Sequence, residues 1–215
     1  MSVIHRTTMA PTKLELLAAW LPTRPWYRGG EDTVPELARA GGFRLDDPEG
    51  EVGIEFMVVT DTAGDETHAY LAPMTYRGAP LEGAEHALIG TSEHGVLGTR
   101  WLYDGAHDPV LLGALTALLE GRAEPQAQSE TDTPDPTVAA SFDGPAGAWD
   151  ASAAPVVADG AHGTDVRLGA GAPPLRIARV LDEKAAGPRG QVVTGWSLPD
   201  GERRRGAYVL VLDPS

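Results

Sequence analysis

The fold is decided by a stretch that reads VGIEFMVVTD at residues 52–61, THAYLAPMTY at 67–76 and VLGTRWLY at 96–103. In the first segment both alternating sets of residues are largely apolar, which is typical of a central strand or of one covered on both sides. Thr-Ala-Gly-Asp-Glu between the first two segments favours a hairpin turn. Pro73 cannot donate a ladder hydrogen bond, so we expect the second strand to lie at an edge or to carry a bulge. The stretch predicts an antiparallel sheet.

Two amphipathic helices are predicted on either side of this sheet. Thr12 and Glu15 fit a capping box that opens the first helix. In the second, Asp108 is the expected N-cap, Pro109 the first helical residue and Gly121 the stop, with five leucines on one face. We expect this leucine stripe to pack against the sheet.

The other segments carry weaker signals. Residues 34–45 predict a helical turn that ends at Gly41-Gly42, while 78–91 and 143–164 predict loops. Residues 124–136 are polar and interrupted by proline, which indicates a linker or an extended strap. Further strands are predicted at 138–142, 165–168, 175–181, 191–198 and 205–212.

The whole chain is therefore predicted to be of the α+β class. The expected organisation is an α+β domain at 1–121, a linker or strap at 122–136 and a second small antiparallel β-rich region at 137–215. The 26 glycines and 18 prolines favour such a turn-rich architecture over a helix bundle.

Composition also limits the function. Zero cysteines exclude disulfides, thiolate ligands and a cysteine nucleophile. No segment has the features of a signal peptide or the length of a membrane span, so we expect a soluble cytoplasmic protein. The net charge of −14 argues against nucleic acid or an anionic membrane as a partner. This charge either serves solubility or attracts the cationic cluster at 203–205 to the acidic sheet.

Aromatic and cationic side chains define a candidate surface for a ligand or a partner. Large rings close together at Trp20, Trp26 and Tyr27 either form a stacking surface or close one end of the core. The candidate surface consists of Trp26, Tyr27, Arg28, Tyr76, Arg77, Trp101 and Tyr103.

Three stretches together resemble actinobacterial maltokinases. AWLPTRPWYRG at 19–29 resembles their opening WLP–RW(F/Y)–G signature, and YLAPMTYR at 70–77 resembles their YLVPLxYR strand. Residues 98–109, with Tyr103-Asp104 and His107-Asp108-Pro109, resemble the YDA–DP passage. The resemblance covers about residues 10–121 and implies the maltokinase N-terminal cap domain, a cystatin-like curved antiparallel sheet packed on helices. The strands within 165–181 are weakly similar to the intermediate lobe of these kinases.

The resemblance does not extend to kinase chemistry. Family kinases carry a catalytic-loop motif of the His-Gly-Asp type followed by a metal-binding Asp, and His-Gly-Asp is absent from this sequence. We expect no room for a helical kinase lobe in a chain of this length. A P-loop and a Gly-x-Ser-x-Gly elbow are also absent. We assign no catalytic residue, no cofactor and no metal ligand, and predict that the protein is not an enzyme.

Two groups of side chains offer weaker ion sites, and for both we favour ordinary polar loops. Glu82 and His86 are four residues apart, with Glu93-His94 nearby, and this spacing suits a metal site on a helix. The turn carboxylates of Asp61, Asp65 and Glu66 lack the regular ligand spacing of a calcium loop.

The leading hypothesis is a non-catalytic, cap-like accessory or regulatory protein of maltose, trehalose or α-glucan metabolism. It would act by contact with a kinase or another enzyme of that pathway. The alternative is a carbohydrate-binding module that uses Trp26, Tyr27, Trp101 and Tyr103, and a third hypothesis is an unrecognised carbohydrate-active enzyme. Self-association is left open. Exposure of the rings near Trp26 on one face would favour the carbohydrate-binding module.

Overall fold

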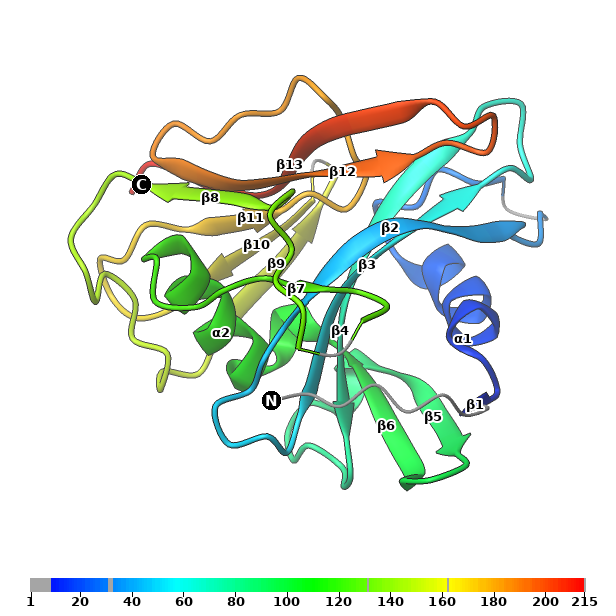
Figure 1. Cartoon of the computed structure of the whole chain (residues 1–215), viewed down its shortest axis with the longest axis horizontal. Coiled ribbons are helices and arrows are strands. Elements are labelled where there is room, and N and C mark those ends of the chain that lie inside the picture. The colour runs from blue at the N-terminus through cyan, green and yellow to red at the C-terminus, as the bar shows by residue number, and fades with distance from the viewer. Residues whose placement is uncertain (1–8, 31–32, 131, 162, 215) are drawn as a thin grey trace.

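The computed structural model describes residues 9–30, 33–130, 132–161 and 163–214. Within these ranges thirteen strands form one connected sheet, joined by two short α-helices and three 3-10 turns (Figure 1). The helical elements are α1 Lys13–Trp20, η1 Leu21–Thr23, η2 Glu85–Ala87, η3 Gly105–His107 and α2 Pro109–Leu119. The strands are β1 Met9–Ala10, β2 Leu37–Leu45, β3 Gly53–Asp61, β4 His68–Arg77, β5 Leu88–His94, β6 Gly98–Asp104, β7 Gln126–Ala127, β8 Ala139–Phe142, β9 Val156–Gly160, β10 Gly163–Arg167, β11 Leu175–Ile177, β12 Gly190–Ser197 and β13 Arg203–Val211.

The sheet is curved, and the segment that follows β11 pairs with β4. The strand order is β1-β5-β6-β4-β3-β2-β12-β13-β11-β10-β9, with β7 beside β2 and β8 beside β12. After β11 the chain returns to β4 in residues 178–181, which we call the returning segment. There the N–H of Leu71 donates to the carbonyl of Arg179, and the N–H of Leu181 donates to the carbonyl of Ala69, both at 2.9 Å. Strands β4, β3, β2, β12, β13 and β11 therefore surround a common core.

The two faces of β3 are both buried, as the alternation of its residues predicts. Ile54, Phe56 and Val58 belong to the larger apolar cluster, which includes the leucines of α2. Met57 and Val59 belong to a smaller cluster with α1. Figure 1 accordingly shows α1 and α2 on opposite sides of the β2–β3–β4 ribbon. Each fully buried large apolar side chain stabilises the folded state by roughly 1.5–3 kcal/mol before the entropy cost. Because β3 supplies such side chains to both clusters, it is the centre of the core.

Both predicted helices are present and begin as expected. Thr12 and Glu15 form a complete capping box at α1. At α2 the carboxylate of Asp108 accepts the N–H of Val110 at 2.9 Å, and Gly121 follows the helix with a φ of 70°, which favours glycine. No helix in the described ranges is long and apolar enough to cross a bilayer.

Pro73 lies where β4 exchanges one neighbour for another. On one edge of β4, residues 69–71 pair with the returning segment, whereas residues 74–77 pair with β6. N–H directions alternate along a strand, so the nitrogen of Pro73 faces the same edge as the N–H of Leu71. The prediction that the strand of Pro73 lies at an edge of the sheet or carries a bulge was wrong, because β4 is an interior strand between β6 and β3. The proline occupies a gap in the pairing, where no ladder hydrogen bond is lost.

Residues 34–45 were predicted to hold a helical turn, and this prediction was wrong because β2 occupies most of them. Gly41 and Gly42 do not end a helix; they lie at a bulge, with φ of 154° and 128°. A Cβ at Gly42 would lie 2.1 Å from the carbonyl oxygen of Phe56. The close approach of two backbones therefore requires this glycine. Strands β5 and β9 were also missed, having been predicted as loops.

The predicted α+β class is contradicted as well. The molecule is a mostly antiparallel β protein, with 41% of the described residues in strands and 14% in helices. A cystatin-like sheet packed on helices is not supported. The sequence patterns located both helices correctly. The error arose because the helices are short and because β2, β5 and β9 lie in segments rich in glycine or polar residues.

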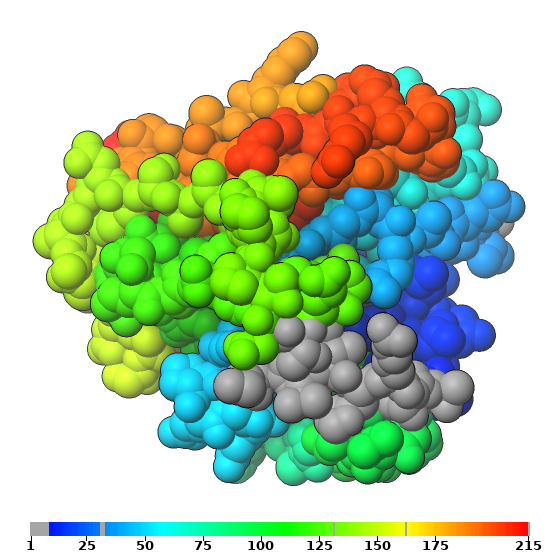
Figure 2. All heavy atoms as spheres, in the orientation of Figure 1, coloured from blue at the N-terminus to red at the C-terminus, as the bar shows by residue number. Residues whose placement is uncertain are grey.

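The segment predicted as a linker or strap lies along the sheet. Gln126 and Ala127 pair with β2, and β8 pairs with β12. Figure 2 shows this yellow-green segment across the face between those strands. The division into domains at 1–121, 122–136 and 137–215 stays a prediction. Strands from the first and last of these ranges share one sheet and the larger apolar cluster.

A buried ion pair joins the returning segment to β6. The side chains of Arg179 and Asp104 are 0% and 4% exposed, and Nη2 of the arginine donates to both carboxylate oxygens at 2.8 and 2.6 Å. Its Nε donates to the hydroxyl of Thr164 at 2.7 Å, and its guanidinium lies 5.1 Å from the centre of the Trp26 ring. One side chain thus contacts β6, β10 and the turn after α1.

We predict that Arg179→Met lowers the free energy of unfolding by about 3–5 kcal/mol, because Asp104 is then buried without its partner. Replacing both residues, as Arg179→Met with Asp104→Leu, should recover part of the loss. Urea unfolding followed by tryptophan fluorescence measures both. Arg176→Met is the control, since it breaks a half-exposed pair with Asp165 and should cost about 0–1 kcal/mol. Equal losses in the Arg179 and Arg176 variants would contradict the role of the buried pair.

Candidate functional site

A groove of about 630 Å³ separates the first part of the chain from the segment that leads into β9. One wall consists of residues 81–84, His86, His107 and Pro109, and the other of residues 152–157. Most of the lining side chains are small or apolar. Glu82 and the two histidines are the titratable groups in the lining.

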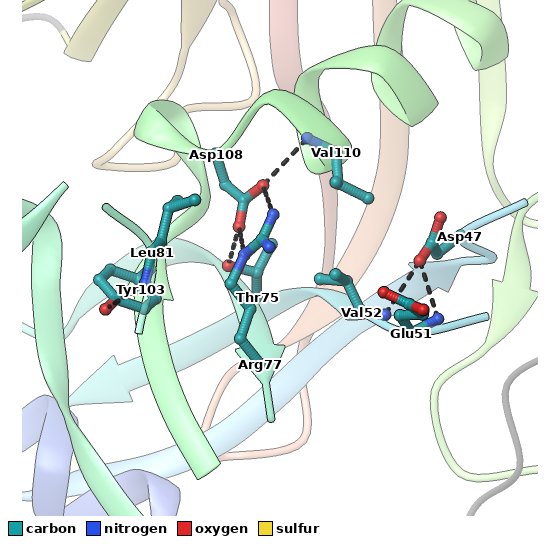
Figure 3. Close-up of polar contacts among 9 residues, drawn as sticks. All are labelled: Asp47, Glu51, Val52, Thr75, Arg77, Leu81, Tyr103, Asp108 and Val110. Atoms are coloured by element: carbon teal, nitrogen blue, oxygen red, sulfur yellow. Dashed lines mark hydrogen bonds and ion pairs between the residues drawn. The ribbon is translucent and has the colours of Figure 1, made fainter. Parts of the chain in front are cut away.

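Two anchored carboxylates fix the position of His107. Asp104 is the N-cap of η3 and is held by its buried ion pair. Asp108, the N-cap of α2, accepts two hydrogen bonds from Arg77 at 2.7 Å and one from the hydroxyl of Thr75 at 2.6 Å (Figure 3). His107 lies between these two carboxylates at the end of η3, so its backbone is held from both sides.

His86 is positioned by the packing beneath it. Ala84 and Ala87 on either side of it are buried against Tyr103. The hydroxyl oxygen of Tyr103 also accepts the N–H of Leu81 at 2.9 Å (Figure 3). These contacts hold the loop on β6 and leave the histidine ring itself exposed in the groove.

The two histidine rings meet in the groove. Nε2 of His86 lies 3.1 Å from Nδ1 of His107, and the rings are nearly perpendicular at 87°. Burial lowers the pKa of His107 from its ordinary value; Asp104 opposes this shift, while His86 and Arg179 add to the lowering. The neutral imidazole, which has one free nitrogen lone pair, is therefore favoured at His107.

The predicted surface residues near α1 are mostly structural. Trp26 is 2% exposed and packs in the smaller apolar cluster. Tyr27 is half-buried and donates to the carboxylate of Asp61 at 2.8 Å. Arg28 is exposed, and its main-chain N–H donates to the hydroxyl oxygen of Tyr70 at 3.0 Å. The stretch closes one end of the core.

The other four predicted residues lie on two faces of the sheet. Tyr76 points toward α1 and donates to Glu55. Arg77 lies on the opposite face, where it pairs with Asp108. On this second face Trp101 pairs in register with Arg77, and Tyr103 pairs with Thr75. Trp101 is half-buried and Tyr103 is 2% exposed. The structure thus does not bring the seven candidates together, although Arg77 and Tyr103 support the groove.

The two weaker ion sites suggested by the sequence also differ in the structure. Glu82 and His86 line the same groove, but η2 begins only at Glu85, so they do not share a helical face. The carboxylate of Asp61 accepts Tyr27 and the N–H groups of Glu36 and Ala63. Among the described residues, no three His, Asp or Glu side chains converge on a metal position. Sequence reasoning missed the partner of His86, because no local spacing rule links residues 86 and 107.

A second buried carboxylate lies on the other face of the sheet. Glu55 is 2% exposed. It accepts hydrogen bonds from Lys13 at 2.5 Å, from Gln128 at 2.7 Å and from the hydroxyl of Tyr76. Burial alone raises the pKa of Glu55, but the Lys13 ammonium and these hydrogen bonds bring it below the ordinary 4.5. The network ties α1 and the strap to β3.

Together these features describe a β-rich protein with a groove where its first part meets the C-terminal strands. Residues 20–108 match the family model described as the maltokinase N-terminal cap domain. The match covers somewhat less than half of the chain and confirms the resemblance inferred from the motifs at 19–29, 70–77 and 98–109. It includes the wall of the groove that carries both histidines. No curated protein matches the chain.

We predict that Glu55→Gln destabilises the protein most at neutral pH. Because the folded-state pKa of Glu55 is depressed, its ionised form stabilises the fold above pH 4.5, and this advantage is lost as the pH falls through the folded-state pKa. The difference in unfolding free energy between wild type and variant should therefore shrink below pH 4.5. Urea unfolding across a pH series measures it, with the exposed Glu66→Gln as control. A pH-independent difference would contradict this account.

Proposed function

We propose that this protein is a cap-like accessory protein that acts by binding another protein. The partner would be a kinase or another enzyme of maltose, trehalose or α-glucan metabolism. The observation that carries the proposal is the match of residues 20–108 to the maltokinase N-terminal cap domain. The matched segment supplies one wall of the groove, which gives the partner a defined place to bind.

The buried ionisable groups support a binding role over a catalytic one. Asp104, Asp108 and Glu55 are buried. Each is used in contacts that hold secondary-structure elements together. A general acid or base must come within hydrogen-bond reach of a substrate, and covered carboxylates of this kind do not.

The groove and the charge of the chain indicate the chemistry of the partner surface. Val156 in the groove is 65% exposed, so an apolar side chain of the partner can be buried against it. The net charge of −14 favours a partner with a basic surface around that contact. Association should then slow as the salt concentration rises.

A carbohydrate-binding module is the weaker candidate. Sugar stacking needs an open aromatic face, and Trp26 and Tyr103 are each 2% exposed. Calorimetry with maltose and longer glucans tests it directly. Saturable binding that Trp101→Ala abolishes would favour this candidate over protein docking.

We predict that Val156→Glu weakens capture of the partner by about tenfold or more. An unpaired carboxylate buried at the contact costs at least about 1.4 kcal/mol, which corresponds to tenfold in affinity. Tagged protein would be incubated with a lysate of its native host, and the bound proteins quantified by mass spectrometry. The supporting result is an enzyme of α-glucan, maltose or trehalose metabolism that is retained by wild type and lost with Val156→Glu.

Val96→Glu is the matched control, because Val96 is 63% exposed and does not line the groove. It should retain the partner. Equal loss with both variants, or capture only of enzymes from other pathways, would contradict the proposal. ATP turnover with maltose by the purified chain would overturn the non-catalytic role.

A further inference from the structure

The two facing histidine nitrogens in the groove have a spacing close to that of two ligands of one metal ion. In a tetrahedral site each imidazole nitrogen lies about 2.0–2.1 Å from the ion, which places two such nitrogens roughly 3.3 Å apart. Nε2 of His86 and Nδ1 of His107 are 3.1 Å apart and face each other. Without an ion, this arrangement requires one proton to lie between the two nitrogens.

Both rings are carried on segments that other contacts hold in place. His107 follows Asp104, whose carboxylate is fixed by Arg179, and precedes Asp108, which is fixed by Arg77. The loop of His86 rests on Tyr103. Preorganised ligands lose little conformational entropy when an ion binds, so two protein ligands can suffice for measurable affinity.

The surroundings suit a cation with open coordination positions. Glu82 lines the same groove and adds negative charge, and the chain as a whole carries −14. No third protein ligand converges on the pair among the described residues. In the groove, water or a partner group can fill the remaining positions. Imidazole ligands favour Zn²⁺, Ni²⁺ and Cu²⁺ over Mg²⁺ or Ca²⁺.

We propose that His86 and His107 bind one divalent transition-metal ion at the groove, with the other coordination positions open to an exogenous ligand. The ion would link the loop that carries η2 to the start of α2. This inference is independent of the proposed function, because it concerns the ion alone. Glu82 and His86, the pair suggested by sequence spacing, are replaced by a pair of histidines that lie 21 residues apart.

The test uses untagged full-length protein, titrated with Zn²⁺ by calorimetry and with Cu²⁺ by electron paramagnetic resonance. We expect one ion per chain, with nitrogen hyperfine structure from two imidazoles in the copper spectrum. His86→Ala and His107→Ala should each weaken binding by more than about tenfold, since loss of an outer-shell contact alone costs 10–100-fold. His68→Ala, which removes a histidine outside the groove, should bind as wild type does.

A second readout guards against misfolded variants. Zn²⁺ should raise the melting temperature of wild type and of His68→Ala but of neither groove variant, and circular dichroism before titration shows whether each variant is folded. His86 is exposed, so its replacement should leave the fold intact. The proposal is overturned if neither ion binds saturably, or if folded His86→Ala binds with wild-type stoichiometry and affinity.

Discussion

The structure depends on the buried contact between Arg179 and Asp104. These residues are 75 positions apart, and their pairing holds the returning segment beside β4 at the place where β6 ends. A charge removed from water is costly without its partner, so the contact favours the arrangement of strands that keeps Arg179 beside Asp104. His107 follows Asp104 by three residues and takes its place in the groove from the same contact.

Much of the central sheet was predictable because its signals are local. The two-sided apolar pattern of β3 and the caps at Thr12 and Asp108 each depend on neighbours within a few residues. The closure of the sheet was not predictable, since residues 69–71 pair with a segment more than a hundred positions later. The prediction of the fold class was wrong for a related reason. Gly41-Gly42 serves equally well as a helix stop or a bulge, and only the partner backbone of Phe56 decides between them.

The candidate surface was inferred from residue types that are as common in cores as at binding sites. Trp26 and Tyr103 have large apolar rings and are each 2% exposed. Removing such a ring from water stabilises the fold, so the ring packs in the core unless a ligand covers it at the surface. The groove was missed because its walls come from distant parts of the chain, one inside and one outside the segment that matches the cap family. The site therefore belongs to the whole chain, not to the matched segment alone.

The interrupted pairing of β4 has a consequence for the matched segment taken alone. At Pro73 the strand passes from one neighbour to another, and the neighbour of residues 69–71 comes from outside the matched segment. A chain cut back to the matched segment would lack residues 178–181 and would leave residues 69–71 as an unpaired sheet edge, which invites pairing with foreign strands. The C-terminal part of the chain therefore shields the sheet that the matched segment begins.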